Sequence, residues 1–147
     1  MKRFEFSLKK LYQYKEQVLK KEKNSLGELR KQQLQLIEDK KMCIIKKGEK
    51  CRELNGQINK GLSPQHIALH KNYIDSLDEK ILNFAFRIEN LENSIQKQLE
   101  LIIELTKEID SLEKLEGKQL EEYKKIELKQ NELFIEEFVS HSTFTKN

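Results

Sequence analysis

The chain has 147 residues, 37% hydrophobic and 36% charged, so apolar side chains are too few to fill a deep globular core. Heavy use of Lys, Glu, Leu and Ile with one Pro and five Gly is typical of long helices or a coiled coil. No segment approaches the ~20 apolar residues of a membrane span, and the first ten residues lack the apolar core of a signal peptide. We therefore expect a cytoplasmic protein.

A first helix is predicted from about Phe4 to Ile58. Its apolar residues have helical spacing, but their register shifts near Leu36, which predicts a stutter. Beyond it the expected seam runs through Ile37, Ile44, Cys51 and Ile58. Lys15 and Glu22 occupy would-be core positions, so the earlier part is expected to be the less stable one. Cys43 and Cys51 are about 12 Å apart by helical rise, too far for a disulfide, and Cys51 is predicted to be a reduced core residue.

A turn is predicted over residues 59–63. Gly61 suits the left-handed residue that follows a helix end, and Ser63 followed by Pro64 is a helix start signal. A turn this short returns the second helix antiparallel to the first.

A second helix is predicted from Pro64 to about Val139, with a tail over residues 140–147 that carries no pattern and is expected to fray. Its seam is formed by seven isoleucines at an unbroken seven-residue spacing, with one polar break at Gln98 among the interleaved positions. The isoleucines are Ile67, Ile74, Ile81, Ile88, Ile95, Ile102 and Ile109.

The predicted fold is all-α: one domain, residues 1–147, forming a long two-helix antiparallel coiled-coil hairpin. Folding about the turn pairs residues whose numbers sum to about 123. Residues 1–60 carry a net charge of +9 and residues 61–147 a net charge of −6, which favours this pairing. About twenty residues, Leu120 to Val139, are left without a partner from the first helix. This apolar overhang is a candidate binding element.

The sequence carries no motif of a catalytic, cofactor or phosphate site. His66 and His70 have a metal-compatible i,i+4 spacing, but no further Cys or His is placed to complete a zinc site. We expect no enzyme activity, no cofactor, no metal and no small-molecule substrate. The acidic half competes for the charge of the basic half, so we expect no nucleic-acid binding.

Two apolar pairs fall off the seam and are candidates for a binding surface: Met42 with Ile45 on the first helix, and Leu82 with Phe86 on the second. Together they predict an exposed apolar patch in the half of the hairpin near the turn. The alternative interpretation is a broadened core, with the hairpin bent or packed against another copy. The residues leave both open.

An ordered set of motifs resembles the FliJ family, the soluble component of the flagellar type III export apparatus. The likeness spans nearly the whole chain, with Gly117 a departure because a helix former is expected in mid-helix. The motifs are Phe4-x-Phe6-x-Leu8, Gly61-Leu62-Ser63, Tyr73-Ile74-x-x-Leu77, residues 112–119, Glu122-Tyr123 and the tail from Glu132 to Phe138.

This resemblance implies a protein similar to the central stalk of rotary ATPases. It implies that the overhang enters the hexameric export ATPase and promotes its assembly, with Tyr123, Ile126, Phe134 and Phe138 as contact residues. It also implies binding to export chaperones and to the cytoplasmic domain of the membrane export gate, the latter through Met42, Ile45, Leu82 and Phe86. The expected location is cytoplasmic, peripheral at the inner face of the membrane.

Three alternatives stay open at this stage. Isoleucine at a with leucine at d also favours a parallel homodimeric structural coiled coil without an export role. The basic first half permits a nucleic-acid-binding module. The injectisome counterpart in virulence secretion has the same physical design as the flagellar protein.

Overall fold

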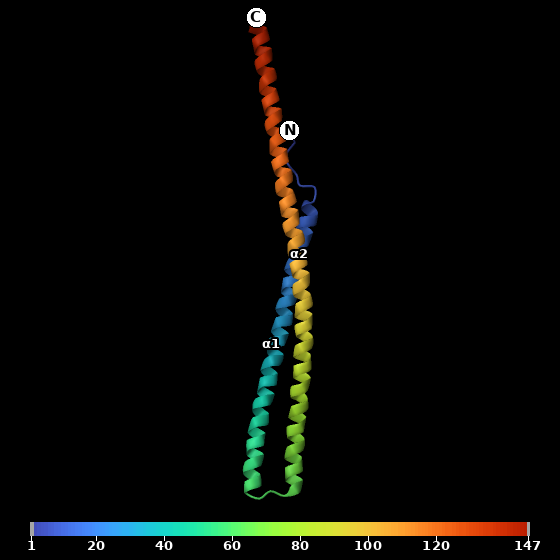
Figure 1. Ribbon diagram of the computed structural model, residues 1–147, viewed down its shortest axis with the longest axis vertical. Helices are drawn as coiled ribbons and strands as arrows, with labels where there is room; N and C mark the ends of the chain where they lie inside the picture. The colour runs from blue at the N-terminus through green and yellow to red at the C-terminus, as the bar shows by residue number, and fades with distance from the viewer. Residues whose placement is uncertain (1, 147) are drawn as a thin grey trace. The chain divides into compact units, whose positions relative to one another are not determined.

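The computed structural model describes residues 2–146, and the side chains of residues 2–142. This part of the chain holds two helices, α1 at Lys9–Asn59 and α2 at Pro64–Lys146, and no strand (Figure 1). The all-α class and the two long helices packed against each other confirm the predicted fold class. The chain forms two compact units, Lys21–Ile102 (unit 2) and Met1–Lys20 with Ile103–Asn147 (unit 1). That the chain is a single domain stays a prediction.

Both helices have one end where the sequence did not place it. α1 begins at Lys9 instead of near Phe4, because the first residues contact α2 outside helical geometry. α2 continues to Lys146 instead of ending near Val139, since no Gly or Pro follows Gly117 to stop it. The last residue of the predicted tail, Asn147, lies outside the described residues.

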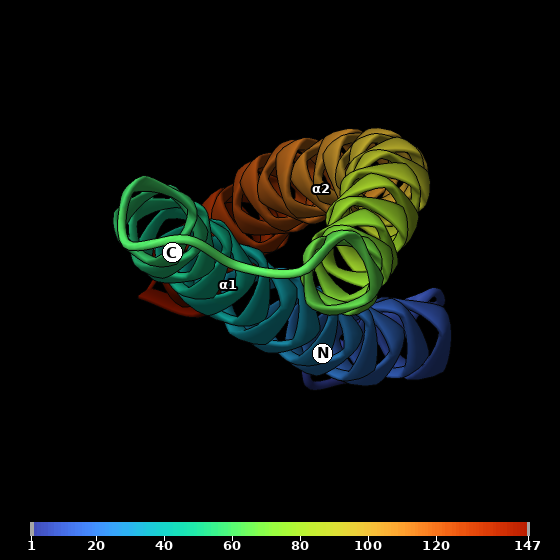
Figure 2. The ribbon, with the colours of Figure 1, turned by 90° about the horizontal axis from the view of Figure 1, so that it is seen from below.

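The turn between the helices has the predicted chemistry. Gly61 has a φ of 91°, the left-handed conformation that glycine adopts without strain. The Ser63 hydroxyl oxygen accepts a 3.4 Å hydrogen bond from the His66 amide, which caps α2, and lies 2.5 Å from His66 Nδ1. Figure 2 shows the short link from the end of α1 to the start of α2. The helices of unit 2 are therefore antiparallel neighbours.

Cross-helix contacts in unit 2 confirm the pairing expected from the turn. Lys47 Nζ lies 2.6 Å from Asp78 Oδ1, and Gln33 Nε2 donates a 2.7 Å hydrogen bond to Glu92 Oε2. Hydrogen bonds from Gln33 and Gln96 lower the pKa of the Glu92 carboxyl. The core of this unit is thin. Its buried residues are Leu26, Leu36, Leu54, Leu77 and Ile95.

The predicted seam of α1 in unit 2 is wrong by one residue. Ile37, Ile44 and Ile58 are 44%, 50% and 42% exposed, and Cys51 is half-buried. The positions that face α2 precede them along the chain, beginning with Leu36 and Cys43. From Leu26 to Gln57 these inward positions keep one seven-residue register, so no stutter occurs at residues 36–37. They are Leu26, Leu29, Gln33, Leu36, Lys40, Cys43, Lys47, Lys50, Leu54 and Gln57.

Two lysines, Lys47 and Lys50, are among the residues of α1 that face α2 in place of the expected isoleucine series. Lys47 ion-pairs with Asp78, and the Lys50 amine lies 5.5 Å from the centre of the Tyr73 ring. A lysine stem of four carbons covers apolar surface while its amine stays in water. Leu36 and Leu54, at the two ends of this stretch, fix the register of α1. The lysines between them therefore lie over the seam isoleucines of α2.

In unit 1 the first residues form an N-terminal segment, Lys2–Phe6, that contacts α2. Phe6 is 6% exposed, and its carbonyl accepts a 3.1 Å hydrogen bond from the Lys9 amide where α1 begins. Farther along α1, Tyr12 Oη donates a 2.8 Å hydrogen bond to Glu113 Oε1. Hydrogen bonds to Glu16 and to Glu113 raise the pKa of the Tyr12 phenol well above its ordinary range.

Gln98 and Glu22 form a hydrogen-bonded polar layer in the seam of unit 2. Gln98 Nε2 donates a 2.9 Å hydrogen bond to the Glu22 carbonyl and a second one to the Glu22 carboxylate. Both residues are half-buried. A layer of this kind fixes the register of a coiled coil at a cost in stability.

We expect opposite results from single and double replacement of this layer. Gln98→Leu leaves the Glu22 carboxylate without its donor and should lower the free energy of unfolding by about 1–2 kcal/mol. Glu22→Leu with Gln98→Leu fills the layer with apolar atoms and should raise it by about 1–3 kcal/mol. Urea unfolding followed by circular dichroism measures both; a double variant less stable than the single one contradicts the expectation.

Candidate interaction surfaces

The C-terminal stretch of α2, residues 124–141, is exposed at every position. Figure 1 shows this part of α2 continuing beyond the N-terminal segment. Its large apolar side chains are more than half exposed, although a monomeric helix normally covers such residues. The exposed fractions are Ile126 51%, Leu128 60%, Leu133 56%, Phe134 70%, Ile135 59%, Phe138 68% and Val139 55%.

The apolar side chains of the C-terminal stretch surround most of the helix. At 3.6 residues per turn they are spread over about two thirds of its circumference, with the polar residues Glu127, Gln130, Asn131 and Glu137 between them. The remaining third is a polar stripe formed by Lys125, Lys129, Glu132, Glu136 and Ser140. A partner that lies along one side of a helix covers about half of it. Full coverage of this stretch requires a surface that surrounds the helix.

The uncovered part of α2 begins later than the sequence indicated. The prediction placed its start at Leu120, but Leu120 and Tyr123 are half-buried. The Phe4 ring lies 5.5 Å from the Tyr123 ring, centre to centre, and Tyr123 Oη donates a hydrogen bond to the Lys2 carbonyl. The N-terminal segment thus engages Tyr123, and the fully exposed stretch starts at Lys124.

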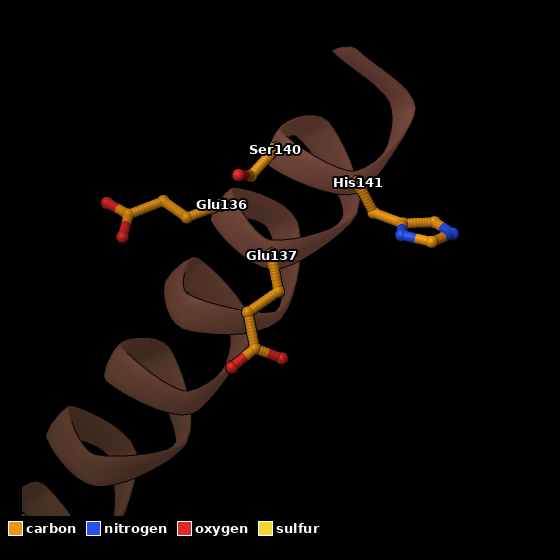
Figure 3. A pocket seen from close by; sticks show the side chains of 4 residues that line it. All are labelled: Glu136, Glu137, Ser140 and His141. Atoms are coloured by element: carbon orange, nitrogen blue, oxygen red, sulfur yellow. The ribbon is translucent and has the colours of Figure 1, made fainter. Parts of the chain in front are cut away.

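The hollow at the end of the C-terminal stretch is open. Figure 3 shows its four lining side chains, Glu136, Glu137, Ser140 and His141, all carried by α2 and directed away from the helix axis. Within residues 2–142 no group of three or more His, Cys, Asp or Glu side chains is placed to hold a metal ion. Neither helix is long and apolar enough, in its described residues, to cross a membrane.

The four residues of the predicted patch in unit 2 are all exposed. Leu82 and Phe86 are 70% and 63% exposed, and Met42 and Ile45 are 48% and 43% exposed. Each pair lies one turn apart on its own helix. Met42 directly precedes the inward residue Cys43, whereas Leu82 directly follows the inward residue Ile81. The two therefore lie on opposite flanks of the antiparallel pair.

Sequence reasoning missed the residues that do lie beside Leu82. Ile37 and Ile44 directly follow inward residues of α1, as Leu82 does on α2, so the three share one flank. Leu34, 67% exposed, lies on the same flank. The sequence did contain a signal for this register: Leu29, Leu36, Cys43 and Lys50 repeat at seven-residue spacing, one residue before the isoleucine series.

Two long antiparallel helices with exposed apolar surfaces define this chain as a coiled-coil protein of helical-hairpin type. The chain belongs to the family described as flagellar FliJ protein, whose model matches residues 4–147. This confirms the resemblance found in the sequence and identifies an export-related flagellar protein from a family of export components that are not known enzymes. Comparison with curated proteins and with solved structures gives no match.

Proposed function

We propose that this protein is a stalk-like component of flagellar type III export that inserts the C-terminal stretch into the hexameric export ATPase and promotes its assembly. The observation that carries the proposal is the set of exposed apolar side chains distributed around about two thirds of this helix. A ring of subunits surrounds a helix placed at its centre. It therefore covers side chains that would stay exposed to solvent if a partner contacted only one side of the helix. Membership of the flagellar family supports a partner within the export apparatus.

The contact residues proposed for the ring are Ile126, Phe134 and Phe138. Tyr123, also predicted from the sequence, is engaged by the N-terminal segment, so its contribution requires that segment to move. Aromatic side chains that become fully buried dominate the energy of most protein interfaces. The stalk would favour one arrangement of the ring by binding its subunits unequally.

Replacing Phe134 and Phe138 by Ala should weaken capture of the purified export ATPase at least tenfold, because two exposed rings lose their binding surface. The melting temperature should stay unchanged, since both rings are more than two thirds exposed. The matched control is Lys129→Ala with Glu136→Ala on the polar stripe, which should keep most of the binding. Equal capture of wild type and a folded Phe134/Phe138 variant would remove the proposal.

We further propose that the predicted patch of unit 2, Met42, Ile45, Leu82 and Phe86, binds the cytoplasmic domain of the export gate. Export chaperones are proposed as additional partners, and the expected position is peripheral at the inner face of the membrane, reached through these partners. Leu82 and Phe86 support the gate proposal because their exposure is unusually high for such large apolar side chains. Met42 and Ile45 complete the proposed contact set.

Changing Leu82 and Phe86 to Ser should lower gate binding by about tenfold while helicity and melting temperature stay unchanged. Met42→Ser with Ile45→Ser is the companion variant on α1. Because Met42 and Leu82 lie on opposite flanks, the two variants show which flank the gate contacts. Gate binding that survives both changes would contradict the proposal, and a large loss of thermal stability would show that the residues are core.

A further inference from the structure

One flank of unit 2 combines apolar side chains from both helices. We name it the apolar face and define it by Leu34, Ile37 and Ile44 of α1 with Leu82 and Phe86 of α2. Each is between 44% and 70% exposed. Ala85 lies between the last two on the α2 side and is half-buried. Four of these residues lie on one side of the pair, and Phe86 lies beside them on the outer side of α2, because it falls midway between the inward residues Phe84 and Ile88. Together they form a larger surface than scattered single residues make.

Two observed contacts show on which side of the helix pair the α2 residues of the apolar face lie. Asp78 and Glu92 each directly follow an inward leucine of α2, and they contact Lys47 and Gln33. These contacts show that residues coming directly after an inward residue in the chain lie on one side of the pair. On the opposite side, a shallow hollow is lined mainly by polar residues, Gln32, Gln35, Asp39, Arg87 and Asn90, together with Leu36 and Leu91.

The charged side chains around the apolar face are separated by helix. α1 contributes mostly cations there, and α2 mostly anions. The cations of α1 are Arg30, Lys31, Lys41 and Arg52, with Glu38 as the exception. The anions of α2 are Asp75, Asp78, Glu79, Glu89 and Glu92, with Lys71 as the exception. A surface with this pattern is complementary to a copy of itself that is turned so that α1 meets α2.

We propose that the apolar face binds the same face of a second copy of this chain, with the two-fold axis parallel to the helices. Each α1 then lies on α2 of the other copy, and the turns lie at the same end. Ile44 is level with Leu82 within one chain, so it meets Leu82 of the second copy. A two-fold axis perpendicular to the helices would instead place the basic α1 against another basic α1.

The size of the face is sufficient for an association of this kind. From Arg30 to Arg52 the face is about 33 Å long, and two helices side by side are about 20 Å wide. Burying it on both copies removes about 1,300 Å² from water, at the low end of stable interfaces. We therefore expect a reversible dimer. This inference does not depend on the proposed export role.

Analytical ultracentrifugation of the full chain from about 1 μM to 1 mM tests the association. The expected result is a reversible shift from 17.6 kDa towards twice that mass, weakened by added salt because the flanking charges are exposed. Ile44→Ser with Leu82→Ser should weaken the dimer at least tenfold. Met42→Ser on the opposite flank is the control and should leave it unchanged. A monomer over the whole range overturns the proposal and leaves the face to another protein.

The orientation of the two copies in the dimer is tested separately, with the residues of the apolar face left unchanged. A spin label on Lys60→Cys, with Cys43→Ala and Cys51→Ala, reports the distance between the two turns. The proposed arrangement gives less than about 30 Å, because the turns of adjacent hairpins lie side by side. The perpendicular axis gives about 60 Å, because each turn is about twenty residues from the centre of the face. The longer distance overturns the proposed arrangement.

Discussion

Leu77→Ala is expected to lower the free energy of unfolding by about 2–5 kcal/mol, the range measured for buried leucines. Leu77 is 3% exposed and lies where α1 covers the α2 seam mainly with lysine stems. Truncation to Ala removes buried apolar surface and leaves a cavity in the seam. Urea unfolding followed by circular dichroism measures the loss.

The matched control is Leu82→Ala on the same helix. Leu82 is 70% exposed, so its truncation should change the free energy of unfolding by less than about 0.5 kcal/mol. The comparison holds residue type and helix constant and varies burial alone. Equal losses for the two variants would mean that Leu82 is covered in solution, in which case the measurement should be repeated at low protein concentration to separate folding from self-association.

Two neighbouring residues of α1 should respond very differently to the same change. Leu36 is 9% exposed and Ile37 is 44% exposed. Leu36→Ala should cost about 2–4 kcal/mol, because it removes one of the few leucines that hold the α1 register. Ile37→Ala should cost less than about 1 kcal/mol. The difference between their urea midpoints, at equal slope, is the quantity to compare.

This pair decides between the two registers of α1. The sequence pattern predicts that Ile37 begins a new series of core residues. In the structure Leu36 faces α2 instead, and the inward positions that continue its register include lysines. If Ile37→Ala proves the more damaging change, the isoleucine stripe faces α2 and the structure-based register of unit 2 is wrong.

The turn and the pairing of the helices were predictable because their signals are local and strong. Gly61 is left-handed as expected, Ser63 caps α2, and the contact of Lys47 with Asp78 follows from folding about that turn. The break at Gln98 was visible as a polar residue in an apolar series, but its partner, Glu22, required the pairing as well.

The register of α1 was not predictable from apolar periodicity alone. Ile37, Ile44 and Ile58 form a regular series, and a hydrophobicity pattern places such a series inward. The competing interaction is coverage of the seam by the stems of Lys47 and Lys50, which an apolar count does not include. The series therefore indicated a contact surface where we had expected a core.

The candidate sites were predictable from the sequence only in part. The exposed C-terminal stretch follows from the unequal lengths of the helices, which the turn position fixes. The sequence did not show that Phe4 leaves the helix to contact Tyr123, because a residue near a chain end has no periodic neighbours to set its conformation. The binding roles of these surfaces stay predictions.

The turn at residues 60–62, exposed at Lys60 and Gly61, has a practical consequence for experiments on this protein. A tag fused at the N-terminus adjoins the segment that contacts Tyr123, and one fused at the C-terminus extends the stretch proposed to enter the ring. Gly61 is exposed, and no neighbouring atom lies within 4 Å of a Cβ built there. Loop tips of this kind accept inserted sequence well. An epitope or fluorophore placed in the turn should therefore report on the intact protein in living cells without obstructing either end.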